Sequence, residues 1–102
     1  MASTEENRDT ECRRVVARGR VQGVGFRENC VHHARSGGVA GWVRNRSDGT
    51  VEAVLQGSPA VLDAMCDWLR HHVPGARVDV LEVQVLPRPC RKLEGFERRS
   101  SV

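Results

Sequence analysis

The order of strand-like and helix-like segments predicts an α+β fold, with two helices packed on one face of an antiparallel sheet. Two observations lead to this prediction. Helical spacing of apolar residues appears twice, each time after a segment rich in β-branched residues, and an Asp-Gly turn joins the two middle strands. The chain has 102 residues, which is enough for one domain with one core. We assign residues 13–99 to that domain and expect the polar residues 1–12 to form a disordered tail.

The first half of the chain reads as a strand, a glycine-rich loop and a helix. A strand is expected over Arg13–Arg18, where two valines and an alanine follow one another. A short amphipathic helix follows the loop, because Phe26, Cys30 and Ala34 repeat every four residues. Gly37-Gly38 is expected to end this helix, since glycine readily adopts the left-handed conformation of a helix C-terminus.

The middle of the chain reads as a hairpin followed by a second helix. Strands expected over 40–46 and 50–56 flank Ser47-Asp48-Gly49, and Asp-Gly is a strong hairpin signal. Ser58-Pro59 offers an N-cap followed by proline in the first helical position, and Pro74-Gly75 ends the helix. The apolar stripe expected on this helix consists of Val61, Leu62, Met65, Leu69 and Val73, flanked by Cys66 and Trp68.

The last third of the chain completes the sheet. A fourth strand is expected over 77–86, and its apolar alternation changes phase, which indicates a bulge. Pro87 and Pro89 end it, and a short edge strand is expected over 95–99. The order β-α-β-β-α-β is typical of the ferredoxin-like fold. Right-handed crossovers make its first two strands parallel, so the loop after the first strand and Asn45 lie at the same edge of the sheet.

The main candidate for function is the loop Gly19–Arg27, which has three glycines in seven residues. Such a loop turns sharply, and the helix after it presents unpaired N–H groups and the positive end of its dipole. Arg27 in the first helical turn is explained if an anion, best a phosphate, lies between its guanidinium and those amides. The alternative is a plain flexible turn with a solvated arginine, because the pattern is neither G-x-G-x-x-G nor a P-loop.

Composition argues against several classes of partner. The formal charge is +3, and the two tryptophans and two phenylalanines are not interleaved with basic residues, so we expect no nucleic-acid binding. No apolar run is long enough to span a membrane, and the polar N-terminus lacks the apolar centre of a signal peptide. We therefore expect a soluble, cytoplasmic protein that does not bind membranes.

The four cysteines do not form a recognisable metal motif. Cys12, Cys30, Cys66 and Cys90 are widely separated, and no two of them form a C-x-x-C pair. We expect no metal and no cofactor. Free thiols are the default in a reducing compartment, with Cys30 and Cys66 acting as small residues in or near the core.

Three stretches, taken together, resemble the acylphosphatase family, and the resemblance extends from about Arg14 to Phe96. The order and spacing of the three are those of the family. The matching residues are Gly19-Arg20-Val21-Gln22-Gly23-Val24-Gly25-Phe26-Arg27, Gly41-Trp42-Val43-Arg44-Asn45 and Asp48-Gly49-Thr50-Val51-Glu52. The resemblance implies a ferredoxin-like fold and hydrolysis of small acyl phosphates to carboxylate and inorganic phosphate, without a metal.

The resemblance also implies a role for each matching residue. Arg27 corresponds to the arginine that binds the phosphate, and Asn45 to the asparagine that positions the attacking water. The phosphate cradle corresponds to the backbone amides of Arg20, Val21, Gln22, Gly23, Val24, Gly25 and Phe26. The chain departs from the family at Glu28-Asn29-Cys30, where aromatic and hydroxyl residues are often seen after the arginine, and at Gly37, where a large apolar residue commonly ends the helix. It departs again at Arg98, a place that is usually apolar.

The chemistry of the residues agrees with the implied reaction. Phosphoryl transfer depends mostly on positioning and on charge stabilisation. A leaving carboxylate, with a conjugate acid of pKa about 4 to 5, needs no protein general acid. The expected protein is a monomer whose partners are an acyl phosphate substrate and inorganic phosphate. Two alternatives remain: an anion-binding module without turnover, and a stand-alone relative of the acylphosphatase-like domain of carbamoyl-transfer maturation proteins.

Overall fold

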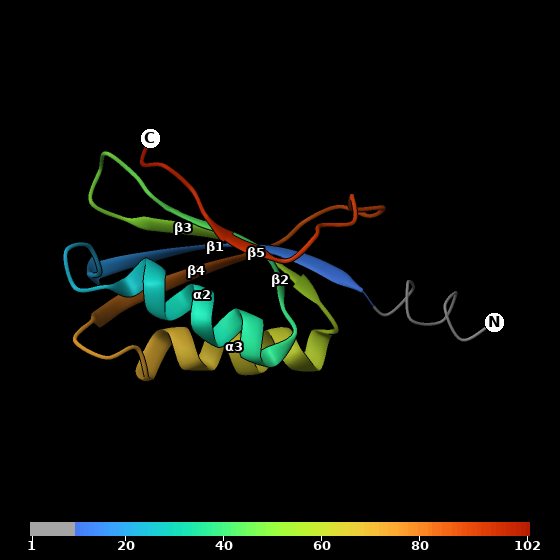
Figure 1. Cartoon of the computed structure of the whole chain (residues 1–102), viewed down its shortest axis with the longest axis horizontal. Coiled ribbons are helices and arrows are strands. Elements are labelled where there is room, and N and C mark those ends of the chain that lie inside the picture. Colours follow the sequence, from blue (N-terminus) through green and yellow to red (C-terminus); the bar gives the residue numbers. More distant parts are fainter. Residues whose placement is uncertain (1–9) are drawn as a thin grey trace.

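A computed structural model describes residues 10–102 as a five-stranded sheet with two helices packed on one face (Figure 1). Residues 1–9, most of the tail expected from the sequence, lie outside the described residues. No helix within residues 10–102 is long and apolar enough to cross a bilayer. The elements are β1 (Glu11–Arg20), α2 (Phe26–Gly37), β2 (Ala40–Asn45), β3 (Val51–Gly57), α3 (Pro59–His71), β4 (Arg77–Val85) and β5 (Phe96–Arg98).

The strand order is β4-β1-β3-β2-β5, which confirms the ferredoxin-like topology. Both β1 and β2 pair antiparallel with β3 and therefore run in the same direction, as the right-handed crossover requires. The expected edge strand forms as β5 and pairs parallel with β2, so the sheet is mixed rather than purely antiparallel. In Figure 1 the loop after β1 and the β2–β3 hairpin lie at one end of the sheet, and the β4–β5 connection lies at the other.

The core lies between the helices and the sheet and follows the predicted apolar pattern with one correction. Leu62, Met65 and Leu69 of α3 are buried, as predicted, but Val61 is 36% exposed. Cys66 takes its place on the buried stripe, because a step of about 100° per residue puts it beside Leu62 and Leu69. The Ser58 hydroxyl accepts a hydrogen bond from the Val61 N–H, which confirms the predicted N-cap.

The predicted bulge lies between β1 and β4. Arg18 pairs with Val80 and Gly19 with Val78, so Asp79 is the additional residue on β4. At Gly19 the backbone has φ +131°, and a Cβ there would lie 2.3 Å from the Arg77 carbonyl oxygen. Gly19 therefore allows the close approach of β4, and it belongs to β1 rather than to the loop that follows.

β1 begins at Glu11, two residues before the expected start of the strand. Cys12, which we expected in the tail, is buried at 3% exposure. The extension pairs Glu11 with Gly57 and Cys12 with Gln56 at the end of β3. The longer hydrogen-bonded ladder explains why the strand continues past the polar residues that suggested a tail.

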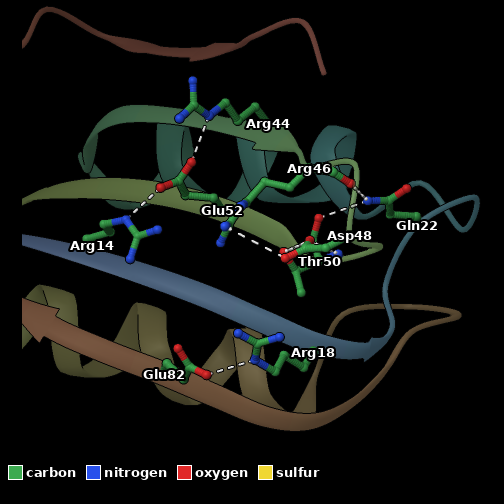
Figure 2. Close-up of polar contacts among 9 residues, drawn as sticks. All are labelled: Arg14, Arg18, Gln22, Arg44, Arg46, Asp48, Thr50, Glu52 and Glu82. Atoms are coloured by element: carbon green, nitrogen blue, oxygen red, sulfur yellow. Dashed lines mark hydrogen bonds and ion pairs between the residues drawn. The ribbon is translucent and has the colours of Figure 1, made fainter. Parts of the chain in front are cut away.

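The sheet face away from the helices carries a buried carboxylate held by two arginines (Figure 2). Glu52 accepts hydrogen bonds from Arg14 Nε at 2.6 Å and Arg44 Nε at 2.7 Å. Burial opposes ionisation, but the hydrogen bonds from Arg44 and Arg14 outweigh it and lower the Glu52 pKa. This carboxylate therefore stabilises the fold at neutral pH, and the contribution is lost as the pH falls through its lowered pKa.

Both tryptophans stack on polar planar groups. The guanidinium carbons of Arg44 and Arg99 lie over the Trp42 ring, at 4.9 and 4.7 Å from its centroid. On the helical side, Trp68 of α3 stacks on His33 of α2, with ring centroids 4.0 Å apart and an interplanar angle of 4°. Each tryptophan packs against neighbouring side chains and lies outside the loop that the sequence singled out.

Candidate functional site

Two glycines shape the loop between β1 and α2. Gly23 and Gly25 have φ of 76° and 79°, a left-handed conformation that side chains other than glycine adopt only at a cost. Gly25 is the N-cap of α2, and no side chain caps the helix there. The loop therefore delivers the chain into a helix whose first N–H groups have no side-chain acceptor.

The start of α2 has the properties of an anion site. Within α2 the Asn29 N–H donates to the Gly25 carbonyl at 3.0 Å, and the Asn29 side-chain amide donates to the same oxygen. These bonds hold the first turn in shape without occupying the amides that precede Asn29. Unpaired amides and the positive end of the helix dipole together favour a bound anion.

A hollow of about 120 Å³ lies against this helix end. It brings together Arg27 and Asn45, which the sequence placed in separate elements, with four of the seven expected cradle residues. The lining residues are Val21, Gly23, Gly25, Phe26, Arg27, Glu28, Asn45 and Arg98.

Arg27 is held at the hollow by the C-terminal segment. Its Nη1 donates to the carbonyl oxygen of Arg99 at 3.3 Å. Within residues 10–102 it forms no ion pair with a carboxylate, so most of its donors remain available. A half-buried guanidinium with free donors beside helix amides is suited to a tetrahedral anion.

Asn45 ends β2 with its side chain at the hollow. Its backbone carbonyl accepts from the Val102 N–H at 3.0 Å, while its carboxamide has no protein partner in the described part of the chain. The Asn45 side chain therefore makes no hydrogen bond within the turn that follows it. Asp48 makes such bonds instead, accepting from the Thr50 N–H and hydroxyl, and these hydrogen bonds lower the Asp48 pKa.

Three of the expected cradle residues direct their side chains elsewhere. Arg20 is exposed at the end of β1, and Val24 packs against the core. Gln22 points to the hairpin, where its Nε2 donates to the Arg46 and Thr50 carbonyl oxygens, each at 2.8 Å (Figure 2). Gln22 thus ties the loop to the turn that follows Asn45.

Sequence reasoning missed the ion pair at the rim of the hollow. Arg98 Nη1 donates to Glu28 Oε1 at 2.7 Å, joining the end of β5 to the first turn of α2. Both positions stood out as departures from the family pattern. Their pairing depends on β5 lying parallel to β2, with Arg98 opposite Val43, and no local signal in the sequence indicates that register.

Fold and site together define a small ferredoxin-like domain with a hollow at the uncapped N-terminus of a helix. The acylphosphatase family model matches residues 13–98, and the chain belongs to that family. It is 54% identical over 86 residues to acylphosphatase 1 of Ralstonia nicotianae, covering 84% of each chain. It is 50% identical over 100 residues to a Burkholderia lata acylphosphatase, covering 97% of this chain and all of the other.

The fold agrees with a solved member of the family. The structure of an acylphosphatase from Coxiella burnetii superposes with a TM-score of 0.87 at 30% sequence identity. The match covers 94% of this chain and 99% of that one. The family resemblance and the ferredoxin-like fold expected from the sequence are both confirmed.

Replacing Gln22 should destabilise the protein, because Gln22 links the loop to the β2–β3 hairpin. Gln22→Ala removes two hydrogen bonds and should lower the free energy of unfolding by about 1–3 kcal/mol. Gln22→Glu should cost more, because a carboxylate oxygen would then face two carbonyl oxygens. Urea unfolding measures both. The same two substitutions at Gln84, an exposed glutamine of β4, are the matched controls. If Gln84→Ala and Gln22→Ala lowered the free energy of unfolding equally, the hydrogen bonds of Gln22 would not stabilise the loop.

Proposed function

We propose that the hollow binds the phosphate of a small acyl phosphate and that water hydrolyses the carboxyl–phosphate bond there. Membership of the acylphosphatase family makes the chain a hydrolase of this class. One observation supports the assignment of residues above all others: Arg27, Asn45 and the uncapped start of α2 line the same hollow. The products are a carboxylate and inorganic phosphate.

Arg27, the backbone amides and Asn45 each have a role in the proposed reaction. The Arg27 guanidinium and the amides of the loop and first turn bind the phosphate oxygens and stabilise the charge that builds on them. The Asn45 carboxamide holds the attacking water in line with the phosphorus. The leaving carboxylate is a weak base and departs without a protein proton donor, so no histidine or carboxylic acid is assigned to the reaction.

The rest of the proposal concerns the state of the protein. We expect a cytoplasmic monomer that binds neither nucleic acid nor membrane. A hydrolysis assay with benzoyl phosphate or acetyl phosphate tests the central claim. A protein that binds phosphate but does not turn over either substrate would be an anion-binding module instead.

Arg27 should be needed for binding and for turnover together. Inorganic phosphate at 100 times its dissociation constant should stabilise the native protein by about 2.7 kcal/mol, and Arg27→Gln should remove most of this stabilisation. Arg27→Lys should rescue little hydrolysis, because a point charge does not reproduce two parallel hydrogen bonds. Thermal unfolding with and without phosphate, at matched ionic strength, measures the first effect. An unchanged phosphate shift in Arg27→Gln would place the anion elsewhere.

Asn45 should affect turnover more than affinity. Asn45→Ala removes a group that acts mainly in the transition state and should lower kcat by about 100- to 1,000-fold, or about 2.7–4 kcal/mol. KM and phosphate binding should change little. Steady-state kinetics with benzoyl phosphate measures both constants. A variant with raised KM and unchanged kcat would rule out the positioning of water.

The Glu28–Arg98 pair should adjust phosphate affinity through charge. The pair is about half exposed, so each effect is modest, about 2- to 5-fold. Arg98→Gln should weaken phosphate binding, because the Glu28 carboxylate then faces the anion unpaired. Glu28→Gln should strengthen it. If Arg98 acts only through Glu28, the double variant should bind phosphate as tightly as Glu28→Gln does. Calorimetric titration of the three variants with phosphate measures these affinities, and weaker binding by the double variant would contradict this.

A further inference from the structure

Two thiols meet at the end of the sheet opposite the hollow. Cys12 lies near the start of β1, and Cys90 lies in the connection between β4 and β5. The Gln56 Nε2 donates to both sulfur atoms, at 3.2 Å to Cys12 Sγ and 3.7 Å to Cys90 Sγ. Two cysteines far apart in the sequence thus contact the same buried Gln56 side-chain amide.

The rest of the Gln56 side chain holds the connection in this position. Its Nε2 also donates to the Arg91 carbonyl at 2.8 Å, and its Oε1 accepts from the Leu93 N–H at 2.7 Å. The segment that carries Cys90 is therefore fixed on the sheet before any covalent bond forms. This removes much of the entropic cost of bringing the two thiols together.

The two thiols differ in access to solvent. Cys12 is 3% exposed, whereas Cys90 is only half-buried and lines an open hollow of about 810 Å³. Burial and a hydrogen bond with Cys90 raise the pKa of Cys12 to about 11. Cys12 therefore stays a protonated thiol at neutral pH, and a small oxidant in the hollow meets Cys90 first.

We propose that Cys12 and Cys90 form an oxidisable dithiol, in which Cys90 reacts first with a peroxide and Cys12 resolves the product. The Cys90 sulfur attacks the O–O bond, giving a sulfenic acid and one water. The Cys12 thiol then gives its proton to the hydroxyl of the sulfenic acid as its sulfur attacks Cys90 Sγ, so the hydroxyl leaves as a second water and a disulfide forms. The two thiols lose two electrons and two protons, and the peroxide accepts both.

The disulfide joins β1 to the β4–β5 connection and closes a long loop of the chain. Such a link stabilises a protein mainly by restricting its unfolded state. The site hollow lies at the other end of the sheet, so oxidation raises the melting temperature and leaves hydrolysis unchanged. The helical thiols Cys30 and Cys66 are buried, and burial raises the pKa of both. They stay reduced under the same treatment.

Treatment of the reduced full-length chain with a small excess of hydrogen peroxide tests the proposal. Thiols are then counted after denaturation, and peptide mass spectrometry identifies the linked pair. The wild type should fall from four free thiols to two, with a Cys12–Cys90 peptide and a higher melting temperature, and dithiothreitol should reverse both. The rate of linkage after the first oxidation should not depend on protein concentration.

Variants separate the two thiols. Cys12→Ala should leave a sulfenic acid at Cys90, which dimedone labels, and Cys90→Ser should show neither label nor linkage. Cys90 is half-buried, so its serine variant gives a readout even if Cys12→Ala fails to fold. Four remaining thiols, a link that involves Cys30 or Cys66, or a disulfide between two chains would each overturn the proposal.

Discussion

The site depends on the shared direction of β1 and β2. These strands flank β3, and each is antiparallel to it, so their C-terminal ends lie at one edge of the sheet. The loop that begins α2 and the turn that follows Asn45 are therefore neighbours. Gln22 joins the loop to this turn with two hydrogen bonds, which fix the position of the loop relative to Asn45.

The C-terminal segment also helps to position the residues of the site. β5 adds to the edge of the sheet beside β2, and the chain beyond it supplies the Arg99 carbonyl that holds Arg27. Val102 then exchanges hydrogen bonds with Asn45 and Ser47. An arginine near a helix N-terminus is electrostatically disfavoured by itself, so these contacts help to explain how Arg27 is retained there.

Most of the fold could be predicted from the sequence because its signals are local. Helical spacing, the Asp48-Gly49 turn, the Ser58 cap and the phase change in β4 each depend on neighbouring residues. The meeting of Arg27 and Asn45 also followed, since crossover handedness is general. The Glu28–Arg98 pair did not, because it depends on the register of a three-residue strand. The Cys12–Cys90 cluster was missed for a similar reason: it joins the start of β1 to an irregular connection.

The stacked tryptophans give the molecule two separate optical reporters. Trp42 contacts the guanidinium groups of Arg44 and Arg99, and the Arg99 carbonyl accepts a hydrogen bond from Arg27, so Trp42 emission should respond to changes at the site end of the sheet. Trp68 stacks on His33, whose pKa burial lowers. Because a protonated imidazole quenches indole more strongly than a neutral one, Trp68 emission should fall as His33 takes up a proton, at a lower pH than for an ordinary histidine. Occupancy of the site and contact between α2 and α3 should thus be distinguishable by tryptophan fluorescence within one unlabelled chain.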